Sequence, residues 1–457
     1  MKQVLITLFS LLIGLSTGYG QASQAKTMSL DEAIAYALTN SMEVQLSQIN
    51  IADAQEQIVE RRALGIPQLS ASGSYQYFID IPTQILPDFI SPAVYGVLFQ
   101  EGVLPQGEVP SGGTQPAQFG TTHNITGQID LSALIFDGSY LVGLKAAKEY
   151  RKYVQEQLQA TNGDLRARVV EAYMAGLIIQ ENVATLDNNI ENLGKVLNET
   201  QALYKEGFVE QLDVDRLELS LTNLKTEREN LQRQLEIALN ALKFTIGMPV
   251  SEGLAISDNM DNILASFDNE LLTQQVTYQQ RAEYRVAQIG LDLNELNVDL
   301  YRAGYLPSLA AFGSYQQSYL TNDLSEGEWF PTTVVGLQLN VPIFDGLQKK
   351  AQIERARLGL EQARVQSKQL EQVIDLEVSN ARAAFVSARE RVENQKRSLE
   401  LAQRIYETTQ IKYKEGVGSS LEITQAEQSL YETQSNYNAA LYDLLVAKAG
   451  LEKAIGL

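Results

Sequence analysis

The sequence predicts an α+β membrane protein in which one unit, a pair of β-strands followed by a long helical hairpin, occurs twice. Three observations lead to this fold class. Short motifs recur in the same order in both halves of the chain, four segments alternate apolar and polar residues, and two long segments rich in Ala, Leu, Glu and Gln contain no proline. Repetition indicates a duplicated architecture, alternation indicates strands, and the proline-free segments indicate helices.

The duplication rests on three motifs that return in the second half of the chain. They are a proline-led strand start, an Ile-Phe-Asp-Gly junction and a Tyr-Lys-Glu-Gly turn, at 66–75 and 306–315, 135–138 and 343–346, and 204–207 and 413–416. The first copy is longer between its first two motifs. Its additional residues lie in 80–121, where several prolines and glycines predict a long loop that projects into solvent.

The motifs divide the chain into two repeats. The first, 21–247, is predicted to contain a helix at 29–65, strands at 68–79 and 122–136 around an extracellular loop at 80–121, and a helical hairpin at 138–246 with its tip near 207. A linker at 248–278 follows. The second repeat, 279–457, is predicted to contain a helix at 279–305, strands at 308–319 and 332–344, and a hairpin at 346–456 with its tip near 416.

The four predicted strands alternate apolar and polar side chains over about ten residues each. The clearest has Ile125, Ile129 and Leu131 on one face and polar residues such as Gln128 and Asp130 on the other. Membrane β-strands show this pattern, and so do soluble antiparallel sheets with one buried face. Aromatic residues near the strand ends favour a membrane barrel with an aromatic girdle: Tyr75, Tyr77, Tyr95, Tyr315, Tyr319, Trp329 and Phe330.

Four strands are too few for a closed barrel, which needs about eight or more. Open sheet edges do not persist in lipid, because their backbone groups have no hydrogen-bond partners there. The chain is therefore expected to oligomerise, and three copies of four strands would supply twelve.

The second helix of each predicted hairpin carries a seven-residue apolar repeat, which is coiled-coil geometry. In the first copy the repeat consists of Val214, Leu221, Arg228, Leu235 and Leu242, with Leu217, Leu224, Leu231 and Ala238 three residues on. In the second it consists of Ile423, Leu430, Tyr437, Leu444 and Leu451, with Ala426, Thr433, Ala440, Ala447 and Ala454. An ordinary helical bundle gives the same periodicity. Asp137 and Asp345, where strand meets helix, are expected to cap the long helices.

The first twenty residues resemble an export signal. Lys2 precedes an apolar run from Val4 to Leu15, and Gly18 and Gly20 provide small residues at the cleavage spacing. We interpret 1–20 as a signal peptide. An uncleaved anchor is the alternative, but the run is shorter than the ~20 residues of a spanning helix.

Composition excludes several functional classes. The chain of 457 residues contains no cysteine and one histidine, and its formal net charge is −20. Disulfides, thiolate chemistry and a lipid-modified cysteine are therefore excluded. Nucleic acid is not expected as a partner, because the phosphate backbone repels an acidic surface. An acidic surface also suits a duct that prefers cations, although many soluble proteins are acidic for solubility alone.

The order of these motifs resembles that of the TolC-like outer-membrane efflux protein family over nearly the whole predicted mature chain. The resemblance includes the opening segment 28–38, the proline-led strands, the Phe-Asp-Gly junctions and the Tyr-x-x-Gly tips. It implies a homotrimer with a 12-stranded barrel in outer-membrane lipid and a long periplasmic α-helical coiled-coil barrel. It also implies a periplasmic adaptor and an inner-membrane transporter as partners, no cofactor, no metal site and no catalysis.

The resemblance also implies where the working residues lie. The hairpin tips, Gly207-Phe208 and Gly416-Val417, would dock the adaptor. Asp213 and Tyr413 would pair across neighbouring hairpins to close the periplasmic entrance, and Glu422 would form a ring of three carboxylates that attracts cations. The alternative interpretation is that the glycines only terminate helices and that Asp213 and Glu422 lie on solvated helix faces.

Two positions depart from the family pattern. Gln425 stands where the family has a second acidic residue, and Gly418 stands where its best-known member has arginine. Arg216 and Asp215 of the first copy are candidates to replace the missing interactions.

Two other functional classes fit the sequence less well. A periplasm-spanning coiled-coil scaffold without a transport role fits the helices but does not explain why barrel-type strands feed them. An enzyme has little support, since His123 is the single histidine and no nucleophile motif is present. The cargo is open among drugs, metal ions, siderophores and polypeptides, although no Met- or His-rich cluster favours soft metals.

Overall fold

The computed structural model describes residues 26–88, 90–108, 113–260, 272–274 and 276–456. The predicted signal peptide at 1–20 and part of the predicted linker at 248–278 lie outside these residues. Backbone contacts divide the chain into two compact units. Unit 1 comprises the described residues of Met1–Gln55, Glu149–Asn294 and Gly359–Leu457, and unit 2 comprises those of Glu56–Lys148 and Glu295–Leu358.

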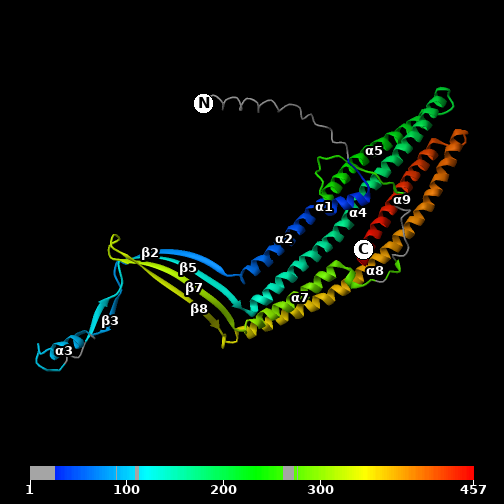
Figure 1. The fold of residues 1–457 in the computed structure, drawn as a ribbon. Coiled ribbons are helices and arrows are strands. Elements are labelled where there is room, and N and C mark those ends of the chain that lie inside the picture. Colours follow the sequence, from blue (N-terminus) through cyan, green and yellow to red (C-terminus); the bar gives the residue numbers. More distant parts are fainter. Residues whose placement is uncertain (1–25, 89, 109–112, 261–271, 275, 457) are drawn as a thin grey trace, which may run out of the picture. The chain divides into compact units, whose positions relative to one another are not determined.

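Unit 2 contains an antiparallel four-stranded sheet in which the two repeats contribute two strands each (Figure 1). Its strands are β2 (Gln68–Tyr77), β5 (His123–Phe136), β7 (Ser308–Thr321) and β8 (Glu328–Asn340), and they are hydrogen-bonded in the order β2-β5-β7-β8. Consequently β2 and β8 are edge strands, each paired on one side only within the described chain.

The strand register separates the sheet into an apolar and a polar face, because side chains alternate along each strand. Directly paired residues on the apolar face include Leu69, Ala71, Tyr75, Ile125, Ile129, Leu131, Tyr315, Tyr319, Trp329, Leu337 and Leu339. The polar face includes Ser70, Ser72, Ser74, Thr126, Gln128, Asp130, Ser314, Gln316 and Gln338. Phe312 also lies on the polar face, over Gly336, where a Cβ atom would come within 2.6 Å of the Phe312 ring.

Aromatic side chains gather at one end of the apolar face. The rings of Tyr319 and Trp329 lie 5.2 Å apart, and the hydroxyl of Tyr75 is 2.9 Å from Nδ1 of His123. Basic residues are missing from this part of the sequence. There is no Lys or Arg between Arg62 and Lys145.

The predicted loop at 80–121 is wrong in one respect, because it contains regular structure. β3 (Thr83–Pro87) and β4 (Thr114–Gln118) form a second antiparallel hairpin, with helix α3 (Ile90–Gln100) between them. The Asp88 carboxylate accepts a hydrogen bond from the Ser91 backbone N–H at 2.8 Å, which caps the start of α3. Gly102, with φ of 71°, follows its end.

The predicted strand at 332–344 also differs from the structure. β8 begins earlier, at Glu328, and ends at Asn340. It ends there because its partner β7 begins at Ser308, which lies opposite Asn340, and no further β7 residue is available to pair. Pro342, which has no N–H to donate, follows two residues later.

Unit 1 contains the first helices and a short parallel ladder between β1 (Lys26–Met28) and β6 (Leu254–Ile256). The single helix predicted at 29–65 is two helices, α1 (Leu30–Asn40) and α2 (Met42–Ala63). Ser41 between them is extended, with φ of −62° and ψ of 145°, and its hydroxyl accepts from the Val44 N–H. The break contacts Gly247, where a Cβ atom would come within 2.4 Å of the Asn40 carbonyl oxygen.

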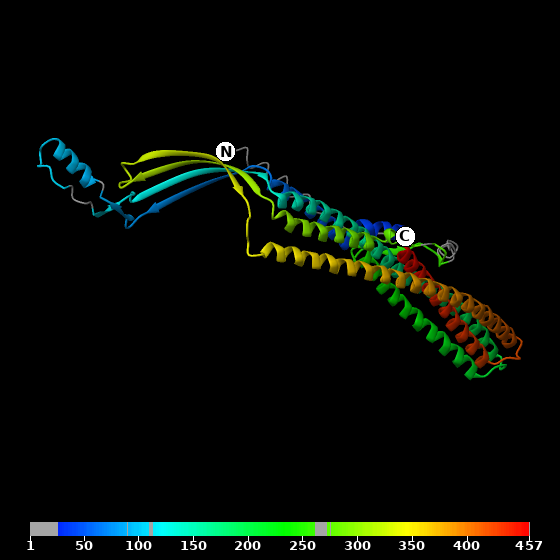
Figure 2. The ribbon, with the colours of Figure 1, turned by 90° about the horizontal axis from the view of Figure 1, so that it is seen from below.

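Each repeat continues into a long helical hairpin (Figures 1 and 2). The first consists of α4 (Gly138–Lys205) and α5 (Gln211–Ile246), and the second of α8 (Gln348–Lys414) and α9 (Ser420–Ile455). As expected, Asp137 accepts from the Tyr140 N–H at 2.9 Å and Asp345 from the Lys349 N–H at 3.0 Å, so both carboxylates cap the helix that follows.

The hairpins pack through most of the predicted heptad positions in unit 1, whereas Leu221, Arg228 and Leu235 are only partly buried. The buried side of α5 includes Val214, Leu217, Leu224, Leu231 and Leu242, and the buried side of α9 includes Ile423, Ala426, Leu430, Ala440, Leu444, Leu451 and Ala454. Toward the tips these residues form one cluster with side chains of α4 and α8. None of the described helices is both long and apolar enough to span a membrane.

Candidate functional site

The tip of each hairpin is a tight turn that depends on one glycine. Gly207 and Gly416 have φ of 79° and 73°, a left-handed conformation that side chains with a Cβ atom adopt only with strain. The next residue closes the turn in both copies: the Phe208 N–H donates to the Leu203 carbonyl at 3.0 Å, and the Val417 N–H donates to the Lys412 carbonyl at 3.0 Å. Both tips therefore end as helix caps of the same type.

Each tip exposes apolar side chains. Phe208 and Val417 are each 77% exposed, and Leu212 and Leu421, in the first turns of α5 and α9, are also exposed. Contiguous exposed apolar groups on a soluble surface indicate a protein-binding surface. The four residues predicted as docking tips lie at the ends of the two hairpins, and Leu212 and Leu421 are exposed in the adjoining helical turns.

The predicted gate residue Tyr413 is in the interior of the tip. Its side chain is 8% exposed, and its hydroxyl is 2.9 Å from the Thr200 Oγ1 atom of the first hairpin. Burial raises the pKa of the Tyr413 phenol, the Thr200 hydrogen bond lowers it in part, and the negative charge of Asp213 raises it further. Tyr413 therefore stays uncharged at neutral pH and ties α8 to α4.

Within the described chain Asp213 bonds Ser420 and Glu210 rather than Tyr413, the partner predicted for it, and so it holds a different part of the tip. Its Oδ1 atom accepts a hydrogen bond from the Ser420 hydroxyl at 2.5 Å, and its Oδ2 atom accepts from the Glu210 backbone N–H at 3.2 Å. Arg216, predicted as a replacement for missing interactions, donates to the same Ser420 hydroxyl at 3.5 Å. Asp215 instead accepts from Gln211 of its own helix, at 2.6 Å.

Glu422 and the two departures from the family pattern lie around the start of α9. Glu422 is exposed in its first turn, and its backbone N–H is capped by the Ser419 hydroxyl. Gln425 is exposed as well. At Gly418 a Cβ atom would come within 3.1 Å of the Tyr413 backbone nitrogen, so a larger residue there would press against the end of α8. Glycine at this position is thus explained by close packing.

Sequence reasoning missed one polar pair that the structure reveals. Glu427 is 3% exposed, and its Oε2 atom accepts a hydrogen bond from the Ser220 hydroxyl of α5 at 3.1 Å. Nothing in the local sequence distinguishes Glu427 from the many surface glutamates of the long helices. Its burial follows from the way the hairpins pack together.

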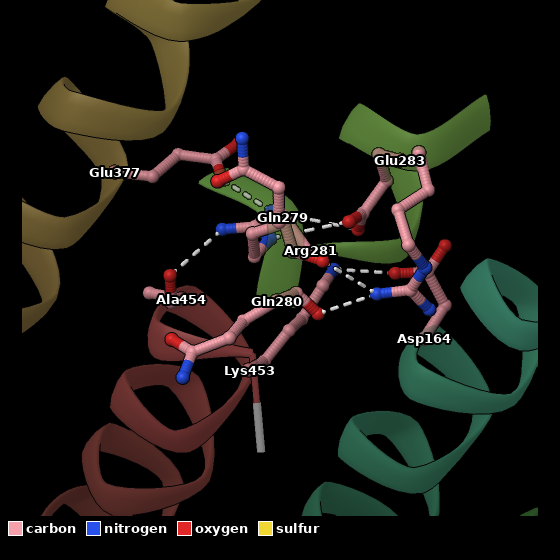
Figure 3. A network of polar contacts seen from close by, with 9 residues as sticks. Asp164, Gln279, Gln280, Arg281, Glu283, Glu377, Lys453 and Ala454 are labelled. Atoms are coloured by element: carbon pink, nitrogen blue, oxygen red, sulfur yellow. Dashed lines mark hydrogen bonds and ion pairs between the residues drawn. The ribbon is translucent and has the colours of Figure 1, made fainter. Parts of the chain in front are cut away.

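A second polar network lies at the opposite end of α9 in unit 1 (Figure 3). Arg281 is 4% exposed and donates to Glu283 at 3.1 Å, to Glu377 at 2.9 Å and to the Ala454 carbonyl at 2.9 Å. Figure 3 also shows Lys453 directed toward Asp164, an ion pair of 2.6 Å.

Arg281 explains why the helix predicted at 279–305 begins later. A short 3₁₀ turn, Tyr278–Gln280, precedes Arg281, and α7 (Ala282–Ala303) starts only after it. The extended Arg281 backbone directs its side chain among α7, α8 and α9. A cavity of about 320 Å³ adjoins the network. In the network, the basic residues Arg281, Arg285 and Lys453 are each paired with a carboxylate, and we therefore interpret the network as a structural clamp.

No group of His, Asp and Glu that is suited to holding a metal ion occurs within the described part of the chain.

Comparison with known proteins gives consistent matches. The family model described as outer membrane efflux protein matches residues 112–248 and 274–457. Outer membrane protein TolC of Vibrio cholerae is 24% identical over 72% of this chain and 76% of its own length. Proteases secretion protein PrtF of Dickeya chrysanthemi is 21% identical over 100% of this chain and 92% of its own length.

Solved structures show the same fold. The outer membrane channel MtrE of Neisseria gonorrhoeae, in its open state, aligns with a TM-score of 0.67 at 20% identity, over 93% of this chain and 88% of its own. A structure of CusC gives a TM-score of 0.67 at 19% identity, over 97% of this chain and 95% of its own. Since the family model covers more than half of the sequence, the chain belongs to the outer membrane efflux protein family, a family of outer-membrane channels and not of enzymes.

Proposed function

We propose that three copies of the chain form a passive duct that carries substrates across the outer membrane. The observation that supports this most strongly is the open four-stranded sheet of unit 2, whose edge strands β2 and β8 each lack a partner on one side within the described chain. Backbone N–H and C=O groups left unpaired in lipid cost several kcal/mol each. Pairing β2 of one copy with β8 of the next removes the edges, and three copies give a 12-stranded barrel.

The two faces of the sheet fit this arrangement. The apolar face, with its aromatic end around Tyr319 and Trp329, suits contact with lipid, where such rings sit at the membrane surface. The polar face, rich in Ser, Thr and Gln, suits a water-filled lumen. The lumen would carry the acidic Asp130 and no basic side chain from residues 63–144, which favours cations over anions.

The exposed apolar tips support docking of a periplasmic adaptor. Phe208 and Val417, with Leu212 and Leu421 beside them, offer an apolar surface at the end of each hairpin. Relatives named for protease secretion and for toluene efflux suggest that the chain serves an inner-membrane transporter of a secretion or an efflux system. The transporter would supply the energy, and the duct itself would have no cofactor.

We further propose that the hairpin tips close the entrance at rest. Tyr413 ties α8 to α4, and Asp213 ties α5 to α9, so both predicted gate residues join one hairpin to the other. Glu422 is exposed beside them and in a trimer would contribute to a ring of three carboxylates. Separation of the hairpins would break the first two contacts and widen the ring.

A direct test is to express the chain in a Gram-negative host and to fractionate the envelope. We expect a trimer in the outer membrane that dissociates on heating and forms ion-conducting channels in planar bilayers. A soluble monomeric product in the periplasm would reject the duct and support a scaffold instead. Outer-membrane trimers without conductance would reject transport while retaining the assembly.

A further inference from the structure

Helices α5 and α9 are joined near the tips by two polar contacts that follow one another along the same seam. The Ser420 hydroxyl donates to Asp213, and the Ser220 hydroxyl donates to Glu427. Both contacts join residues 207 positions apart. The second lies seven residues farther along each helix, about two helical turns from the tip. The order of acid and serine is reversed between them, with the acid on α5 in the first contact and on α9 in the second.

The inner contact differs from the outer one in its surroundings. Glu427 is 3% exposed and lies on α9 between Ala426 and Leu430, which both belong to the apolar cluster near the tips. Its Oε2 atom accepts from Ser220 at 3.1 Å, whereas its buried Oε1 atom has no hydrogen-bond partner among the described residues. A buried carboxyl with one hydrogen bond is costly when ionised, and a buried unsatisfied oxygen calls for a functional explanation.

The groups around Glu427 do not compensate its charge. From α5 it meets Ser220, and from α8 the phenol of Tyr406, whose pKa is raised by burial and by the Glu427 charge. Burial and the Ser220 hydrogen bond are the influences on the Glu427 carboxyl, and no basic side chain is among them.

Other ionisable groups near Glu427 interact with residues other than Glu427. On α9 itself, burial and secondarily the Glu227 charge raise the pKa of Tyr431. Toward the tip, Arg216 contacts Ser420. Burial is the main cause of a Glu427 pKa raised to about 7, and the Ser220 hydrogen bond lowers it in part.

We propose that Ser220 and Glu427 form a second, inner latch of the entrance, which holds α9 against α5 while the hairpins are packed and is broken when they separate. The inference rests on the proposed gate and adds two positioning residues to it. Separation of α9 from α5 exposes the carboxyl to water, where it ionises at its ordinary pKa. The packed state therefore favours the protonated carboxyl and the separated state the ionised one.

The direction of the pH dependence follows from this difference. The packed state binds the proton more tightly than the separated state, so the packed state is favoured at low pH and loses stability as pH rises from the ordinary value of 4.5 to about 7. Between pH 5.5 and 8 the equilibrium constant for opening is expected to increase by at most about 30-fold per chain. The latch thus holds the entrance more firmly in acid.

The experiment uses the full-length trimer in planar bilayers, with open probability recorded from pH 5.5 to 8. We expect wild-type open probability to rise with pH. Glu427→Gln keeps an acceptor for Ser220 without the charge, so this variant is expected to stay mostly closed and to lose the rise. Ser220→Ala leaves Glu427 with no hydrogen bond and is expected to open more often than wild type across the range.

Two controls separate the latch from other titrating groups. Glu218→Gln removes an exposed carboxylate of α5 that lies outside the proposed gate, and the pH profile of open probability is expected to be retained. His123→Gln removes the single histidine and is expected to leave that profile intact as well. A rise with pH that persists unchanged in Glu427→Gln would overturn the latch, and so would its loss in His123→Gln.

A second measurement does not depend on ion flow. Because the chain has no cysteine, Val417→Cys provides one labelling site per copy at the exposed tip for distance measurements between spin labels. We expect the distances to lengthen from pH 5.5 to 8, and to stay short when Glu427→Gln is added. Suppose that the trimer conducts and that Asp213→Ala with Tyr413→Phe opens it. If Glu427→Gln then changes neither the open probability nor the spin-label distances, the latch is wrong and the proposed duct stands. Absence of any conductance rejects the duct itself.

Discussion

The two hairpin tips have the same backbone but different polar groups. Both turn at a left-handed glycine and both expose an apolar residue directly after it. The first hairpin supplies Thr200, Asp213 and Ser220, whereas the second supplies Tyr413, Ser420 and Glu427 at the facing positions. Each of these three contacts therefore joins one residue type from the first repeat to another residue type from the second. The duplicated halves have kept a common fold while their chemistry has become complementary.

The largest effect is expected from the apolar cores that both tips share. Leu217 on α5 and Ile423 on α9 are fully buried in one cluster. Leu217→Ala and Ile423→Ala should each destabilise the tip by about 2–5 kcal/mol through lost burial and a residual cavity. Hydrogen exchange of tip amides in the trimer measures this. Leu219→Ala, at an exposed position of the same helix, is the control, and equal exchange in all three variants would contradict the shared core.

The complementary contacts are the next target. Asp213→Ala combined with Tyr413→Phe removes two hydrogen bonds between the hairpins, one to Ser420 and one to Thr200. We expect single-channel conductance to increase severalfold, because in the proposed gate the closed entrance limits ion flow at rest. Asp215→Ala is the matched control, since Asp215 bonds only Gln211 of its own helix in the described structure. Conductance unchanged from wild type would reject the gate assignment.

The tip glycines test whether the common backbone is required. Gly207→Ala and Gly416→Ala should each cost about 1 kcal/mol, because a Cβ atom disfavours positive φ. Gly194→Ala, in the interior of α4 with open space around it, should instead stabilise the helix by about 0.5–1 kcal/mol. Local hydrogen exchange measures both the expected loss of stability at the tips and the expected gain in α4. The comparison fails if all three substitutions change exchange in the same direction.

The smallest effect is expected at Glu422, which is exposed. The corresponding residue of the first hairpin is Asp213, which is hydrogen-bonded. Glu422→Gln should lower the preference for cations over anions modestly, because other acidic residues remain along the duct. Gln425→Glu is the opposite change, since it adds a carboxylate at an exposed position one turn along α9, and it should raise the preference. Reversal potentials in a salt gradient measure both. Potentials that stay at the wild-type value in both variants would place Glu422 away from the path of the ions.

Much of the fold was predictable because its signals are local. Alternating residues gave the strands, the heptad positions from Val214 to Leu242 gave the buried side of α5, and Asp137 and Asp345 gave the helix starts. Helix α3 was missed because its Asp88 cap and Gly102 end stand among prolines that suggested an irregular loop. The break at Ser41 was not visible, since it depends on contact with the distant Gly247.

The site was less predictable than the fold. The tip glycines and Asp213, Tyr413 and Glu422 came from family resemblance, and the packing against Gly418 became visible only in three dimensions. Glu427 lies next to the heptad residue Ala426, where sequence alone suggests a surface position. Its burial depends on how four helices meet, which no local pattern encodes.

The unpaired edges of β2 and β8 have a consequence for how the protein is produced. A single chain cannot reside in the bilayer at low cost, because its edge strands would place unpaired backbone groups in hydrocarbon. If three chains close the barrel, as proposed, insertion depends on encounters among them, and its rate rises steeply with their concentration. Halving synthesis should lower the number of working ducts by more than half, which makes gene dosage a sensitive control of export capacity.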